Sequence, residues 1–167
     1  MEHMEEFTIP KEAKERLSNP KILHDLLSKG KTFQEIIGYS FATMEKFYSR
    51  AHHLYQDQRY EDAADAFMFL TTLNPNVHNY WLGLGMSEHM NEEYDAALIA
   101  YGMAIMTDVE NPLPHYHSAS CYNALQDKEN ALAAVELAIA YAGDKPEHAP
   151  IKQRALAAKD FLRSGKV

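Results

Sequence analysis

Cysteine is almost absent from this chain, and long apolar runs are missing altogether. The single Cys121 among 167 residues excludes an intramolecular disulfide and favours a reducing compartment. No apolar stretch approaches the roughly 18 residues that a transmembrane helix needs. Residues 1–6 are acidic and lack the hydrophobic segment of a signal peptide. The sequence therefore predicts a cytoplasmic protein with no membrane span.

Basic residues and glycine are also scarce. The 16 Lys and Arg residues are outnumbered by 24 Asp and Glu, which gives a net charge of −8 and a pI near 5.5. Nucleic acid and anionic membranes both attract a basic surface, so neither is an expected partner. With only seven glycines and no alternating strand pattern, the composition favours one mostly helical domain whose partners are proteins.

One pattern occurs three times at a fixed offset. Its central small residues are Ala63, Ala97 and Ala131, and the offset is 97 − 63 = 34 and 131 − 97 = 34 residues. This is the period of tetratricopeptide (TPR) repeats, in which pairs of antiparallel helices stack into a solenoid. The period continues upstream, where three sets of residues correspond: Phe47, Trp81 and His115; Ala51, Gly85 and Ala119; Leu54, Glu88 and Tyr122.

The residue types in these repeats suit closely packed helices. Small residues at positions 51, 85 and 119 let two helix backbones approach, while Phe67 and Tyr101 fill the space between neighbouring helices. The sequence predicts an all-α fold of three TPR helical hairpins in a right-handed α-solenoid, at residues 43–76, 77–110 and 111–144, with a C-terminal capping helix at 149–164.

The segment before the repeats divides into two parts. Residues 1–19 are rich in charge, and we expect a flexible tail or a frayed helix. In residues 20–42 we expect two short helices. Asn19 can cap the first, and Thr32 and Glu35 have the spacing of a capping box for the second.

The first helix of each repeat presents its inner face to the groove of the array, so these side chains decide what the groove can bind. The inner-face positions are Glu45, Tyr48, His52 and Tyr55 in the first repeat, Asn79, Leu82, Met86 and His89 in the second, and Leu113, Tyr116, Ser120 and Asn123 in the third. They contain no lysine or arginine, which argues against a clamp for a C-terminal carboxylate. Aromatic, methionine and neutral polar side chains suit an extended, partly apolar peptide. The alternative is that the tyrosines only pack between repeats.

Nine histidines raise the question of an enzyme or a metal site. His52-His53 and His115-x-His117 have the wrong spacing for one helix face, and no His-Glu-x-x-His run occurs. A metal site formed by His52 and His89 across two repeats is the remaining alternative. No glycine-rich phosphate loop is present. We therefore expect no catalytic residues, no metal and no cofactor.

Several short stretches in a fixed order carry a resemblance to a known family. They are Phe-Tyr-Ser-Arg-Ala at 47–51, the stretch 55–63, Trp-Leu-Gly-Leu-Gly at 81–85, Asp-Val-Glu-Asn-Pro at 108–112, and the lead-in that ends at 29–32. In these the chain resembles the TPR-type class II chaperones of bacterial type III secretion, the SycD/LcrH family. The resemblance extends from about residue 24 to residue 162.

The resemblance implies a function. It implies a cytoplasmic bacterial chaperone that binds an extended N-terminal segment of secreted, hydrophobic translocator proteins in its groove and keeps them secretion-competent without ATP. Matching positions put Tyr48, His52 and Tyr55 at the main hydrophobic pockets, with Tyr60, Leu82, Met86 and Tyr116 nearby. His52 stands where the family pattern has an aromatic residue. A generic TPR scaffold that joins folded proteins stays as the alternative.

Family members also self-associate through their N-terminal helices. The resemblance therefore implies a homodimer in which Ile22, Leu23, Leu26 and Leu27 form the contact. The alternative is that this apolar stripe packs on the first repeat of its own chain.

Overall fold

The computed structural model describes residues 8–164, and every element of regular secondary structure in that range is a helix. The predicted all-α class is confirmed. Along the chain the elements are α1 (Lys11–Ser18), α2 (Pro20–Ser28), α3 (Phe33–Ile37), α4 (Phe41–Gln56), α5 (Tyr60–Leu73), α6 (His78–Met90), α7 (Tyr94–Thr107), α8 (Pro112–Ala124), α9 (Lys128–Ala142), the 3₁₀ turn η2 (Pro146–His148) and α10 (Ala149–Ser164). No helix in the described range is both long and apolar enough to cross a bilayer.

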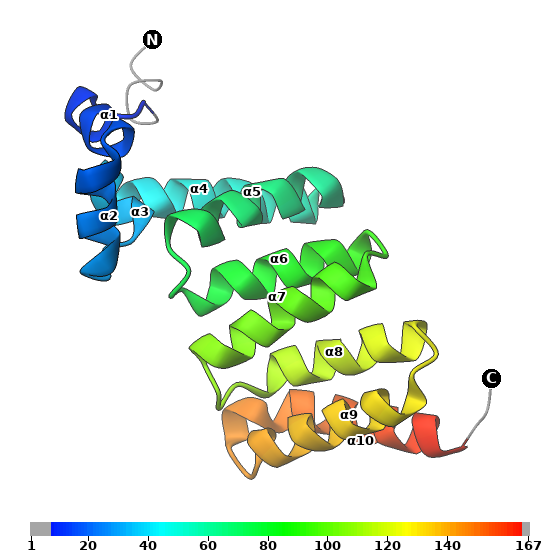
Figure 1. Ribbon diagram of the computed structural model, residues 1–167. Coiled ribbons are helices and arrows are strands. Elements are labelled where there is room, and N and C mark those ends of the chain that lie inside the picture. Colours follow the sequence, from blue (N-terminus) through cyan, green and yellow to red (C-terminus); the bar gives the residue numbers. More distant parts are fainter. Residues whose placement is uncertain (1–7, 165–167) are drawn as a thin grey trace.

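Three helical hairpins, α4–α5, α6–α7 and α8–α9, stack in order and form the body of the molecule (Figure 1). The alanines of the repeat, Ala63, Ala97 and Ala131, are fully buried where the helices meet. Tyr101 is also fully buried, and its ring approaches the backbone of Gly85 so closely that a built Cβ would lie 2.6 Å away. The small and large residues of the sequence pattern therefore interlock between the two helices of the second hairpin, as TPR packing requires.

The turns inside the three hairpins are built alike. Gln58, Glu92 and Gln126 occupy the same repeat position and all have left-handed backbones, with φ of 59°, 63° and 62°. In each turn the next backbone N–H donates to a carbonyl in the last turn of the preceding helix, as from Arg59 to Leu54 at 2.9 Å. Non-glycine residues rarely adopt this conformation, so the hairpin geometry rather than local preference sets it.

The short helices before the repeats have the caps that the sequence predicts. The side chain of Asn19 accepts hydrogen bonds from the N–H groups of Lys21 and Ile22 at the start of α2. Thr32 and Glu35 form the complete capping box of α3: the Thr32 N–H donates to Glu35 Oε2 at 2.9 Å, and the Glu35 N–H donates to Thr32 Oγ1 at 3.3 Å.

The expectation of a flexible tail over residues 1–19 is wrong for its second half. Lys11–Ser18 forms α1, and Ala13 within it is fully buried against the core of the first repeat. Leu17, one turn later, packs partly buried against the same cluster, while most charged side chains of α1 are exposed, which is why composition alone suggested a tail. Residues 1–7 of that segment lie outside the described residues.

The apolar stripe of α2 remains open. No residue of α2 is buried, and Ile22 and Leu27 keep 44% and 41% of their surface exposed. Leu23 and Leu26 are half-buried. Figure 1 shows α2 standing at the N-terminal end of the stack, across the direction of the repeat helices. The stripe therefore is not absorbed into the first repeat.

The last helix, α10, occupies the range predicted for the capping helix and packs along α9. Its anchor is Ala155, which is fully buried. At the surface, Lys159 and Arg163 both pair with Glu136 of α9, at 2.8 and 3.2 Å. Lys152 donates to the carbonyl of Gly143 at the end of α9, where a cation is favoured by the helix dipole.

Candidate peptide-binding groove

A cavity of about 390 Å³ opens between α4 and α6, and we call it the first pocket. It brings together five of the residues that the sequence singles out: Tyr48, His52, Tyr55, Leu82 and Met86. Asn79, which the sequence also places on the inner face, lines the pocket as well, and three further lining residues were not predicted to face the groove: Gln56, Phe67 and Gly83. None of the nine side chains carries a fixed charge, so the pocket suits an uncharged, partly apolar ligand.

The ring of Phe67 forms the floor of the first pocket. The ring can extend to the pocket because residue 83 is a glycine and has no side chain in its way. A Cβ built on Gly83 would lie 2.3 Å from that ring. Phe67 was predicted only as a packing residue, and the repeat pattern alone does not reveal that the opposing glycine leaves its ring facing the groove. The pair Phe67 and Gly83 therefore determines the depth of the pocket.

Tyr48 has two roles at once. Its ring packs edge-on against Phe67 at 6.0 Å and lies tilted against Tyr80 at 5.8 Å, between the first and second repeats. It also lines the first pocket. Packing between repeats and exposure to the groove, which the sequence left as alternatives, thus apply to the same side chain. Burial, with a smaller effect of nearby Glu45, raises the pKa of its hydroxyl, so the group remains a donor at neutral pH.

Tyr55 closes the far end of the first pocket and is supported from behind. Its ring meets Tyr60 of α5 at 5.4 Å in an edge-to-face contact. Tyr60 lies behind this wall and is absent from the lining residues. Burial raises the pKa of the Tyr55 hydroxyl as well, which leaves a neutral hydroxyl beside the apolar floor.

The middle of the concave side is occupied by packed rings. His117 of α8 stacks on Tyr101 at 5.6 Å with an interplanar angle of 14°. His89 faces both of them, with its Nδ1 3.4 Å from the Tyr101 hydroxyl and its ring 6.3 Å from that of His117. Burial, with smaller effects of His89 and Arg154, lowers the pKa of His117 to about 4, so its imidazole is neutral at pH 7.

These groups do not form a metal or nucleophile site. Among residues 8–164 no cluster of three His, Cys, Asp or Glu side chains could hold a metal ion, and His52 and His89 belong to separate parts of the groove. Cys121 is fully buried beside Tyr101, and burial raises the pKa of its thiol to about 12. A thiol that stays protonated is a packing group rather than a nucleophile.

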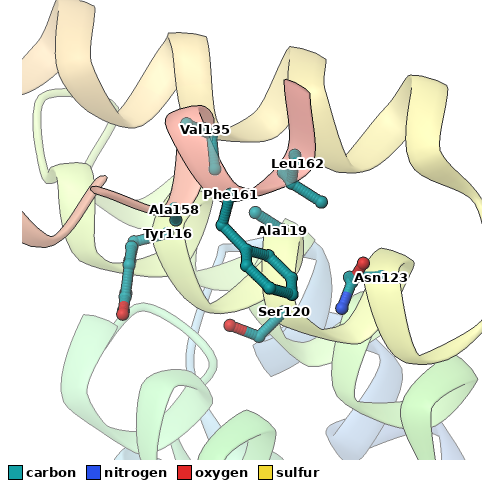
Figure 2. A pocket seen from close by; sticks show the side chains of 8 residues that line it. All are labelled: Tyr116, Ala119, Ser120, Asn123, Val135, Ala158, Phe161 and Leu162. Atoms are coloured by element: carbon teal, nitrogen blue, oxygen red, sulfur yellow. The ribbon is translucent and has the colours of Figure 1, made fainter. Parts of the chain in front are cut away.

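A second cavity, of about 180 Å³, lies at the C-terminal end of the concave side, and we call it the end pocket (Figure 2). Three predicted residues of α8 line it: Tyr116, Ser120 and Asn123. The remaining lining residues are Ala119, Val135, Ala158, Phe161 and Leu162. In Figure 2 the ring of Phe161 descends from α10 between Tyr116 and Asn123.

Phe161 is the residue that the sequence reasoning missed. The α10 stripe of Ala155, Ala158 and Leu162 identifies a packing face, and Phe161 lies at the edge of that face, next to Leu162 and one turn after Ala158. It retains 55% of its surface exposed although it lines a cavity. The last helix therefore contributes to the concave surface as well as covering α9.

Comparisons with known proteins agree with this architecture. The family model "Tetratricopeptide repeat" matches residues 48–107. The low calcium response locus protein H of Yersinia pseudotuberculosis is 30% identical over 132 residues, which cover 79% of each chain.

Solved structures of related chaperones match over most of the chain. PcrH in complex with the chaperone binding region of PopD has a TM-score of 0.74 and 29% identity, over 76% of this chain and 96% of that one. The Yersinia enterocolitica chaperone SycD in complex with a peptide of the translocator YopD has a TM-score of 0.72 and 28% identity, over 77% and 98%. With three TPR hairpins, a lead-in of short helices and this similarity to protein H, the chain belongs to the class II translocator chaperones of type III secretion, a family of chaperones and not of enzymes.

Proposed function

We propose that this chain binds an extended segment of a secreted, hydrophobic translocator protein in its concave groove, and holds that protein in the bacterial cytoplasm until export. The observation that carries the proposal is the first pocket, an uncharged cavity walled by Tyr48, His52 and Tyr55 on one side and by Leu82 and Met86 on the other. The relatives PcrH and SycD support it, because each has been solved with a translocator segment, from PopD, PopB or YopD.

The pocket fits the chemistry of an extended apolar segment. The rings of Tyr48 and Tyr55 and the Phe67 floor can surround one apolar side chain of the ligand. The neutral hydroxyls of the tyrosines and the amides of Gln56 and Asn79 can hydrogen-bond the ligand backbone, which has no partners of its own when extended. At the other end of the groove, Tyr116, Ser120 and Asn123 offer the same kinds of group.

Sequestration needs no energy source. A translocator segment that seeks membranes aggregates when it is free in water, and a chaperone that binds it lowers the free concentration by mass action. The described residues contain no feature that would couple ATP hydrolysis to release, so release falls to the export machinery.

The test is binding of a translocator peptide to variants of the first pocket. We expect Tyr48→Ala and Tyr55→Ala each to weaken binding by about 1–3 kcal/mol, because each removes a ring from the wall of the pocket. Isothermal titration calorimetry with the chaperone binding region of PopD measures this. His53→Ala serves as the control, since His53 is exposed and lies outside the pocket. Unchanged affinity in both tyrosine variants, at unchanged helix content, would contradict the groove assignment.

We also propose that the open stripe of α2 mediates a homodimer. Ile22, Leu23, Leu26 and Leu27 leave apolar surface on a helix that none of the repeats covers. SycD supports this, because its structures include an alternative dimer. A scaffold that joins folded proteins stays as the second candidate. It predicts that the partner binds only when folded, whereas a chaperone binds the isolated segment, so the same titration with the peptide distinguishes them.

A further inference from the structure

The end pocket repeats the construction of the first pocket two TPR units along the chain. Tyr116, Ser120 and Asn123 stand at the repeat positions of Tyr48, His52 and Tyr55, and Val135 stands at the position of Phe67. Each pocket thus has one wall from the first helix of a hairpin and a floor from the second helix. The opposite wall comes from the next helix in the stack, which is α6 for the first pocket and α10 for the end pocket.

The corresponding place between α6 and α8 is filled by the protein itself. There Tyr101 takes the position of Phe67, and His117 takes the position of Gly83. Gly83 packs only its backbone against the buried Phe67 ring and leaves the space beside it open as the first pocket, whereas the His117 ring stacks on Tyr101 and occupies the corresponding space. Its lowered pKa keeps the His117 ring neutral and supports its role as a filler. The two open pockets are therefore separated by a filled centre.

The end pocket has the lining that a side-chain pocket for an extended peptide needs. Val135 and Leu162 form an apolar base, and the exposed ring of Phe161 hangs over it (Figure 2). At its rim, the Tyr116 hydroxyl, the Ser120 hydroxyl and the Asn123 amide make no side-chain hydrogen bond within residues 8–164. These groups are free to pair with a ligand backbone.

We propose that the end pocket binds a second apolar side chain of the same extended segment, so that the client is held at two anchors on either side of the filled centre. This inference rests on the proposed function and extends it to α10. Continuity along the concave side argues for the same occupant, because both pockets lie on the row of first helices that forms the groove. The rim groups of both are uncharged, which excludes a ligand bound through its charges.

The spacing of the two anchors follows from helix packing. The pockets are displaced by two first helices, and packed helix axes lie about 8–10 Å apart, which places the pockets roughly 16–20 Å apart. An extended chain advances about 3.3 Å per residue. The two anchors of the client should therefore be about five or six residues apart.

Two chaperone variants and one control test the inference. Phe161→Ala removes the ring over the end pocket, and Tyr48→Ala removes a wall of the first pocket. Leu156→Ala is the matched control, because Leu156 is also on α10, is 45% exposed and lies outside the end pocket. Circular dichroism confirms that each variant folds. The probe is a fluorescein-labelled peptide of the chaperone binding region of PopD, and fluorescence anisotropy measures its dissociation constant.

We expect Phe161→Ala to weaken binding about tenfold, which corresponds to about 1.4 kcal/mol, and Leu156→Ala to leave it unchanged. Alanine substitution along the peptide should reveal two sensitive positions about five or six residues apart. Alanine at one of these peptide positions should have no further effect on binding to the Tyr48→Ala variant, and alanine at the other should have none on binding to the Phe161→Ala variant. In each case the chaperone side chain that contacts that peptide position has already been removed.

The outcomes separate this inference from the proposed function. If Tyr48→Ala weakens binding while Phe161→Ala binds like the unmodified protein, the groove binds the client and the end pocket does not. If alanine at the same peptide position loses its effect in both the Tyr48→Ala and the Phe161→Ala variants, the client has no separate second anchor and the inference is refuted. If the unmodified protein binds neither the PopD peptide nor the equivalent PopB and YopD peptides, both the proposed function and the inference fail.

Discussion

Gly85→Ala tests the close packing of α6 against α7 in the second repeat. The added methyl group would lie 2.6 Å from two ring carbons of Tyr101, well inside van der Waals contact. Tyr101 is fully buried, with His117 stacked on its ring and Cys121 packed against it, so the ring has little room to move. The second repeat must therefore separate its two helices or accept strain.

Two opposing effects determine the size of the change. Overpacking a buried site costs about 1–3 kcal/mol. Alanine is favoured over glycine inside a helix by about 1 kcal/mol. Gly102→Ala isolates the second effect, because Gly102 lies within α7 and a Cβ there meets nothing within 4 Å. We expect Gly85→Ala to lose up to about 2 kcal/mol of stability, and Gly102→Ala to gain up to about 1 kcal/mol.

Thermal and urea unfolding followed by circular dichroism measure both variants. For a chain of this length, 1 kcal/mol shifts Tm by about 2–4 °C. Gly85→Ala should therefore melt below the unmodified protein and Gly102→Ala at or above it. If Gly85→Ala raises Tm as much as Gly102→Ala does, the close approach of Gly85 to Tyr101 is wrong and the packing argument with it.

Three further predictions concern other parts of the molecule. Because His117 has a folded pKa of about 4 and an unfolded value near 6.5, the unfolded state binds more protons between these values. Keeping His117 neutral therefore contributes at most about 3 kcal/mol to the free energy of unfolding, fully present above pH 6.5 and lost as the pH falls toward 4. The His117→Phe variant has no imidazole to protonate, so its free energy of unfolding, measured by urea titration, should fall less over this pH range than that of the unmodified protein. Thr32→Ala should lower the unfolding free energy by about 0.5–2 kcal/mol, because it breaks the capping box of α3, whereas Thr72→Ala, at an exposed site on α5, should not. Leu27→Glu should convert a dimer to a monomer in light scattering without loss of helix, because it puts a charge into the stripe of α2, and His24→Glu should not.

Contrary results would be equally specific. An identical pH dependence in His117→Phe would mean that the imidazole is not held neutral by burial. A Thr32→Ala variant as stable as the unmodified protein would mean that α3 contributes nothing to the folded body. An unchanged mass for Leu27→Glu would remove the α2 stripe from the interface.

The repeats were predictable because their signals are local and periodic. The spacing of Ala63, Ala97 and Ala131 defines the hairpins, and each of these alanines is fully buried at a helix contact. The caps at Asn19 and Thr32 follow from residue type and spacing alone. The concave positions follow from the same period, since the first helix of each hairpin presents the same face.

The α8 side of the end pocket was predicted, but the side that α10 contributes could not be, because α10 breaks the period. Pro112 at the start of α8 follows His78 at the start of α6 by 112 − 78 = 34 residues, but Ala149 at the start of α10 follows Pro112 by 149 − 112 = 37. The repeat positions therefore do not carry over, and Phe161 is assigned to the groove only when the helices are seen packed. The buried role of Ala13 in α1 was hidden for another reason, which is that Ala13 and Leu17 are only two apolar residues among charged neighbours and give a weak periodic signal.

The left-handed residues Gln58, Glu92 and Gln126 have a consequence for the construction of the whole array. Each costs about 1 kcal/mol relative to glycine, and the cost recurs at every hairpin because the bend is the same each time. The contact faces between hairpins are less uniform than the bends. A duplicate of residues 77–110 inserted behind the original would meet the third hairpin as the original does, but Tyr101 of the original would then face Gly83 of the copy in place of His117. The insertion would lengthen the distance between the two pockets by one module.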